Sequence, residues 1–260
     1  MNSRSPAAEN RASIERNAWS SYFLESRRPT VSLVFVIPIL LIYEVGVLLL
    51  GPQAMRNGAD LWLRHFLDTI GFGQYFLLPL LTVFTLLAWH HVTHEPWKFS
   101  PRLLGLMLAE SALFSVILLG FVQFQGRMME ISQLTVAIQS AEQLAWAAKL
   151  KQVVGYFGAG IYEELLFRLL LLPVLTILIQ GMGVTTKKSL LVAIILSGLF
   201  FSAAHYQVFT SVGDVFEWFS FSFRFVAGVF FAVLFTYRGF GIAVGTHTLY
   251  DVLAVTIQGG

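Results

Sequence analysis

The sequence lacks cysteine and is poor in charged residues. Without cysteine, the chain cannot use thiol catalysis, cysteine metal ligands or S-acylation. Only 12% of the 260 residues are charged and 56% are hydrophobic, whereas a soluble domain has about 25% charged residues. The net charge is +2, and no basic block indicates a nucleic-acid partner. The chain is therefore too apolar for water, and we expect the lipid bilayer to be its environment.

Long apolar stretches make up most of the chain. A helix needs about 20 apolar residues to cross the hydrocarbon of a bilayer. Seven stretches approach or exceed this length: 30–50, 75–93, 103–123, 152–181, 189–208, 219–237 and 240–257. They are too long and continuous for barrel strands, and helices satisfy their own backbone hydrogen bonds in lipid. The sequence therefore predicts an all-α polytopic membrane protein with about seven transmembrane helices.

The chain shows no internal repeat, low-complexity tract or interdomain linker, so we expect residues 1–260 to form a single membrane-embedded domain. Residues 1–29 are a polar tail without the apolar core of a cleavable signal peptide. Residues 57–72 and 127–150 have mixed polarity at helical spacing, which predicts amphipathic helices at the membrane interface. In the predicted topology, ten lysines and arginines lie on the same side of the membrane as the N-terminus, and five lie on the opposite side. This distribution favours a cytoplasmic N-terminus.

Several ionisable residues lie inside the apolar stretches, where each costs at least a few kcal/mol and usually faces the protein interior. They are Glu44, Glu110, Glu163, Glu164, Arg168, His205, Arg224, His247 and Asp251. Most of them fall in the last four stretches. Arg224 is interpreted as a structural partner for Glu44, Glu110, Glu164 or Glu217, and the sequence offers no local partner for Glu44 or Glu110.

The stretch "FGAGIYEELLFRLLLLP" at 157–173 contains two adjacent glutamates and an arginine. Glu164 and Arg168 are four residues apart on one helical face, with the acid first, so they are predicted to form a structural pair. Glu163 is rotated by about 100° from Glu164 and has no partner in its own helix.

The same four-residue spacing recurs in two later stretches. It places Phe201 behind His205, and His247 on one face with Asp251. Together with the unpaired Glu163, these groups would form a water-activating site if their helices converge. Glu163 would then be the general base, and the histidines would position water or stabilise an oxyanion.

These residues compose three motifs, EExxxR, FxxxH and HxxxD, in three successive hydrophobic stretches. The motifs resemble the signature of the CAAX-processing and bacteriocin-processing (Abi) family of intramembrane glutamic endopeptidases. The resemblance covers about residues 150–257 and implies a C-terminal four-helix catalytic core, preceded in residues 30–149 by further spans and amphipathic segments. It also implies hydrolysis of a peptide bond in a protein or peptide substrate at the membrane.

By this resemblance Glu163 is the base, His205 helps it to activate water, and His247 and Asp251 form the oxyanion pocket. Glu164, Arg168 and Phe201 would support the site. Prenyl-protein proteases of the family have asparagine at the last motif position, where this chain has Asp251. Since an ionised carboxylate cannot donate to an oxyanion, Asp251 would be protonated, orient His247 or bind a positive group.

Two alternatives remain open at this stage. In the first, Glu163, His205, His247 and Asp251 bind zinc, although a mechanism without a cofactor is favoured. In the second, the buried charges serve a non-enzymatic transporter or scaffold. Motifs of other proteases are incomplete: "HEPWK" at 94–98 is no HExxH, and "SVGD" at 211–214 is no GxGD.

The histidines in "WHHVTHEPW" at 89–97 are interpreted as interfacial residues, with a metal patch as the alternative. The sequence does not identify a substrate. The short chain without a targeting segment favours a bacterial inner membrane.

Overall fold

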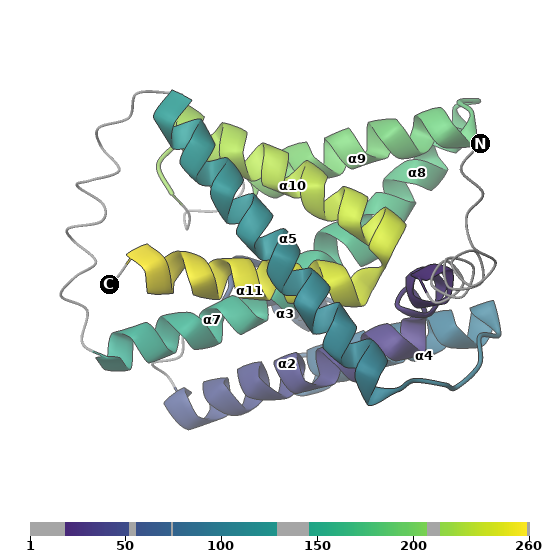
Figure 1. Ribbon diagram of the computed structural model, residues 1–260, viewed down its shortest axis with the longest axis horizontal. Coiled ribbons are helices and arrows are strands. Elements are labelled where there is room, and N and C mark those ends of the chain that lie inside the picture. Colours follow the sequence, from purple (N-terminus) through teal and green to yellow (C-terminus); the bar gives the residue numbers. More distant parts are fainter. Residues whose placement is uncertain (1–18, 52–55, 74, 129–145, 207–213, 259–260) are drawn as a thin grey trace, which may run out of the picture.

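The computed structural model describes residues 19–51, 56–73, 75–128, 146–206 and 214–258. These parts contain helices, turns and one isolated bridge between Tyr206 and Asp214, with no strand among them. The helices are α2 (Pro29–Leu50), α3 (Gly58–Thr69), α4 (Leu77–Thr93), α5 (Pro101–Met128), α7 (Trp146–Glu164), η2 (Leu165–Leu171), α8 (Leu172–Gly181), α9 (Thr186–Ala203), α10 (Trp218–Arg238) and α11 (Phe240–Gln258). Figure 1 shows them as one bundle. The prediction of an all-α polytopic membrane protein is confirmed.

Each of the seven predicted apolar stretches contains a helix within its described residues. Five helical segments in the described parts of the chain are long and apolar enough to cross a membrane: Pro29–Leu50, Pro101–Met128, Lys149–Gly181, Thr186–Ala203 and Trp218–Arg238. Helix α4 is apolar but has only 17 residues. Helix α11 has 19 residues, and polar residues occur within its apolar sequence. It can contain them because much of the helix is buried in the protein.

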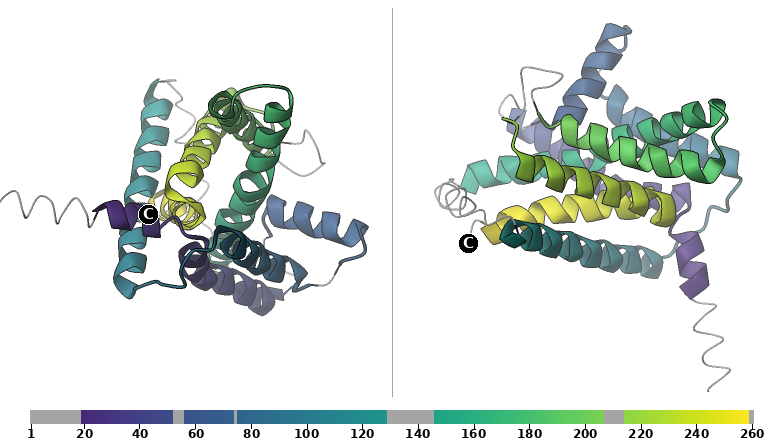
Figure 2. Two further views of the ribbon diagram at one scale, coloured as in Figure 1. Left: turned by 90° about the vertical axis from the view of Figure 1, so that its right-hand side faces the viewer. Right: turned by 90° about the horizontal axis from the view of Figure 1, so that it is seen from above.

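Helix α11 lies at the centre of the bundle, where it contacts α2, α5, α7 and α10. Seen from above, it lies between α5 and α10 (Figure 2). All residues from Phe240 to Thr248 are buried. Since protein rather than lipid surrounds this half of the helix, it can carry Thr246, His247 and Thr248.

Close contact between α7 and α11 depends on a glycine. A Cβ atom at Gly160 would lie 3.0 Å from the backbone nitrogen of Thr248 and even closer to its hydroxyl. Such separations are too short for a side chain, so only glycine lets the two backbones approach this closely. The contact brings Glu163 and Glu164 of α7 next to His247 of α11.

The predicted fourth span is interrupted after the two glutamates. Residues Leu165–Leu171 form a π-helical segment between α7 and α8. Pro173 lies near the start of α8 and cannot donate a backbone hydrogen bond, which favours a wider turn before it. Segments of this kind are frequent at functional sites, and this one contains Arg168.

The two predicted amphipathic segments have different outcomes. The first is helix α3, whose N-terminus is capped by Asn57. The second, 127–150, lies mostly outside the described residues, and the chain resumes with α7 at Trp146. The cytoplasmic location of the N-terminus stays a prediction.

Candidate active site

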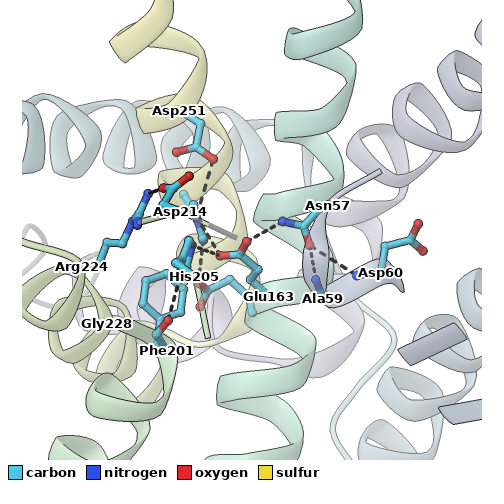
Figure 3. Close-up of polar contacts among 12 residues, drawn as sticks. Asn57, Ala59, Asp60, Glu163, Phe201, His205, Asp214, Arg224, Gly228 and Asp251 are labelled. Carbon is cyan, nitrogen blue, oxygen red and sulfur yellow. Dashed lines mark hydrogen bonds and ion pairs between the residues drawn. The ribbon is translucent and has the colours of Figure 1, made fainter. Parts of the chain in front are cut away.

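Three of the predicted site residues meet at one point, although they come from different parts of the chain (Figure 3). Glu163 on α7 is buried, with 6% of its surface exposed. Its Oε2 atom lies 3.8 Å from His205 Nε2 and 3.7 Å from His247 Nε2. Oε2 is buried and has no hydrogen-bond partner. These separations are longer than direct hydrogen bonds, so Oε2 bonds directly to neither histidine.

His205 follows the last residue of the α9 span, and its position is fixed by the turn of chain behind it. Its Nδ1 atom lies 2.8 Å from the carbonyl oxygen of Phe201. A carbonyl only accepts, so Nδ1 carries the proton. Burial lowers the pKa of His205, whereas the charge of Glu163 acts in the opposite direction. When the ring is neutral, Nε2 is an acceptor and faces the acceptor Oε2 of Glu163.

His247 is surrounded by carboxylates. Its Nδ1 atom lies 2.8 Å from Glu164 Oε1, and its Nε2 atom lies 3.6 Å from Asp251 Oδ2 and 3.7 Å from Glu163 Oε2. The ring of Phe231 stacks on the imidazole at 4.5 Å. Glu164 therefore has a second contact that the sequence did not predict: besides facing Arg168, it orients His247.

Arg168 is completely buried directly behind the site. Its Nε atom lies 3.2 Å from Glu164 Oε2, and its NH2 group donates to the carbonyl oxygen of Gly228. The guanidinium also lies over the ring of Phe201, 4.4 Å from the centroid. Phe201 contacts His205 at 4.9 Å as well, so this ring links the buried pair to the histidine.

Sequence reasoning missed Asn57, which precedes α3. Its side-chain Oδ1 accepts hydrogen bonds from the backbone of Ala59 and Asp60, and its Nδ2 donates to Glu163 Oε1. The "NG" pair before an amphipathic run is a recognisable helix start. That signal could have identified the cap but not its contact with a glutamate 106 residues later.

The remaining buried acids have structural partners. Glu44 accepts from Tyr162 and lies 3.2 Å from Arg64 NH2. Glu110 binds both Arg238 nitrogens Nε and NH2, at 2.6 and 2.7 Å, and also Tyr22. Both acids therefore belong to pairs that hold helices together.

The partner suggested for Arg224 was wrong. Its guanidinium pairs with Asp214, at 2.6 Å, and with none of the four glutamates considered from the sequence. Asp214 lies just before α10, in the segment that returns from His205, and its backbone N–H donates to the carbonyl oxygen of His205. The pair therefore holds Asp214 against α10.

No group of three or more histidine or acidic residues in the described ranges is placed to hold a metal ion. Within the candidate site, Glu163 Oε1 is bound by Asn57 and His247 Nδ1 by Glu164. At the end of α4, His90 is buried and packs against Trp97 with ring centroids 4.3 Å apart; its place at the membrane interface stays a prediction.

Comparison with known proteins identifies the region that carries the site. Residues 145–253 match a family model described as type II CAAX prenyl endopeptidase Rce1-like. Searches of curated proteins and of solved structures gave no match. The matched residues coincide with the region whose motifs resemble the CAAX-processing family, and they confirm that resemblance.

Proposed function

We propose that this chain, a member of the CAAX protease family through residues 145–253, is an intramembrane endopeptidase in which Glu163 activates water. The family indicates a membrane protease. The glutamate mechanism and the roles of individual residues are our proposal, and the arrangement of acceptors around Glu163 supports them.

The observation that carries the proposal is the pair of acceptors formed by Glu163 Oε2 and His205 Nε2, 3.8 Å apart. Neither atom can donate to the other when the carboxylate is ionised and the imidazole is neutral. A water molecule that donates one O–H to each atom satisfies both. Its oxygen lone pair then points away from them, toward a substrate carbonyl carbon.

Hydrolysis follows from this arrangement. As the water oxygen bonds to the carbonyl carbon, its proton passes to Glu163 Oε2, which acts as general base. When the carbon–nitrogen bond breaks, Glu163 returns the proton to the leaving amine nitrogen. The second water proton stays on the new carboxyl group and then passes to the amine, so the products are a carboxylate and an ammonium group, and Glu163 is ionised again.

His247 and Asp251 stabilise the oxyanion in this proposal. The Nδ1–H group of His247 is held by Glu164, so Nε2 is the ring nitrogen that faces the reaction. The carboxylates of Glu163, Glu164 and Asp251 favour a positively charged ring, whose Nε2–H can donate to the oxyanion. Asp251 therefore acts through His247 and does not donate itself, which is the role of orienting His247 considered for it from the sequence.

The proposed reaction uses no cofactor, because Glu163 and His205 supply the base and the water position. The substrate is a protein or peptide segment that reaches the buried site from the membrane. We further propose that the N-terminus lies in the cytoplasm, as the distribution of lysine and arginine favours.

The proposal is tested by comparing membranes from cells that carry the wild type or Glu163→Gln. The glutamine keeps an acceptor for Asn57 but cannot take a proton, so we expect normal expression and complete loss of the chain's cleavage products. N-terminal proteomics detects these products. Glu217→Gln, at an exposed acid before α10, is the matched control and should retain them all.

Two results would contradict the proposal. One is an identical set of fragments from wild type and Glu163→Gln. The other is loss of cleavage by purified protein after treatment with a membrane-permeant chelator, with recovery on adding zinc, which would establish the zinc alternative.

A further inference from the structure

The two oxygens of Glu163 have different surroundings. Oε1 accepts a hydrogen bond from Asn57 Nδ2, whereas Oε2 is buried without a hydrogen-bond partner and faces both histidines. A carboxylate with two free oxygens can rotate and present either of them. A donor fixed on one oxygen removes this freedom and determines which oxygen faces the water.

Asn57 is itself fixed in orientation. Its Oδ1 accepts from the backbone nitrogens of Ala59, at 2.8 Å, and Asp60, at 3.3 Å, as the cap of α3. The capping oxygen determines the orientation of the amide, since a flipped amide would place N–H groups against N–H groups. The Nδ2 group must therefore point toward Glu163 whenever α3 is formed.

Helix α3 is in turn held against α7. Asp60 is buried and accepts from Tyr43, Arg56 and Arg64, at 2.6–2.9 Å. Arg64 also pairs with Glu44, and Glu44 accepts from Tyr162. Tyr162 is the residue before Glu163, so α3 reaches the glutamate both through Asn57 and through this charged network.

We propose that Asn57 is a positioning residue of the active site, which holds Glu163 Oε1 so that Oε2 alone faces the water that it shares with His205 Nε2. This inference rests on the proposed function of Glu163. Asparagine suits the task because its neutral amide donates to a carboxylate while its oxygen caps a helix. A lysine or arginine would form an ion pair and weaken the base.

The test separates capping from donation. Serine and aspartate cap helices about as well as asparagine, but neither presents an amide N–H to Glu163. The cap of α3 should therefore persist in purified full-length Asn57→Ser and Asn57→Asp, and both variants should remain folded at the assay temperature. Their kcat should fall about ten- to a hundredfold, as expected for losing a hydrogen bond to a charged group, with KM within about twofold, since Asn57 does not contact substrate in this proposal.

The assay uses synthetic peptides that span cleavage sites found in wild-type membranes and missing from Glu163→Gln membranes. Ser100→Ala is the control for loss of a cap, because the Ser100 hydroxyl accepts from Leu103 N at the start of α5, in another part of the bundle. This variant should unfold at a slightly lower temperature and keep the wild-type kcat.

Three results would overturn the inference. Wild-type kcat in both Asn57 variants would show that Asn57 only caps α3. Loss of kcat in Asn57→Asp alone would assign the effect to repulsion between two carboxylates rather than to the missing donor. Absence of any Glu163-dependent fragment would overturn the proposed function together with this inference, whereas the first two results leave the proposed function intact.

Discussion

Replacing Arg168 with methionine removes a completely buried guanidinium and keeps much of its volume. Arg168 and Glu164 are both 0% exposed, and 3.2 Å separates Nε from Oε2. Removing one partner of a buried ion pair costs about 3–5 kcal/mol, because the other charge stays buried. Glu164 keeps its contact with His247, so we expect a loss at the lower end, about 3 kcal/mol. Reversible unfolding in mixed detergent micelles measures this free energy.

Two further variants make the measurement specific. The double variant Glu164→Gln with Arg168→Met buries no unpaired charge and should recover at least half of the loss. Arg224→Met is the matched control, since Arg224 pairs with Asp214, whose side chain is 63% exposed. Exposed pairs contribute about 0–1 kcal/mol. If the free energy of unfolding of Arg168→Met lies within about 1 kcal/mol of the wild-type value, water reaches the pair and the reasoning is wrong.

Two other predictions concern α11. Gly160→Ala should destabilise the protein by about 1–3 kcal/mol and lower cleavage, because the added methyl group meets Thr248; Gly120→Ala on α5, where nothing lies within 4 Å, should be neutral or stabilising. Asp251→Ala should lower kcat for the peptides described above, whereas Asp251→Asn should retain more of it, because the amide oxygen can still accept from His247 and orient its ring. Equal activities of the two Asp251 variants would contradict its assigned place beside His247.

The helices and the predicted site residues could be found from sequence for a simple physical reason. An apolar stretch of about 20 residues has few stable forms in lipid other than a helix, so composition alone predicted the architecture. A four-residue spacing then fixes which side chains share a face, and this placed Glu164 with Arg168 and His247 with Asp251.

Contacts between distant segments could not be found in this way. The partner of Arg224 depends on where Asp214 lies beside α10, and the contact of Asn57 depends on where α3 lies against α7. The π-helical segment Leu165–Leu171 was missed as well, because periodicity in a wholly apolar run does not reveal an extra residue in a turn. Each of these features depends on packing rather than on local sequence.

The buried acids also show why a charge in an apolar helix does not by itself mark a catalytic group. Glu110 and Glu44 lie in helices as apolar as that of Glu163, yet each is neutralised by an arginine and a tyrosine hydroxyl. Glu164 is neutralised by Arg168 and His247 in the same manner. Glu163 has an amide on one oxygen and two imidazoles beyond direct hydrogen-bond distance of the other. Because no ion pair within hydrogen-bond distance offsets its burial, Glu163 differs from these three glutamates, and this difference supports the catalytic role that we propose for it.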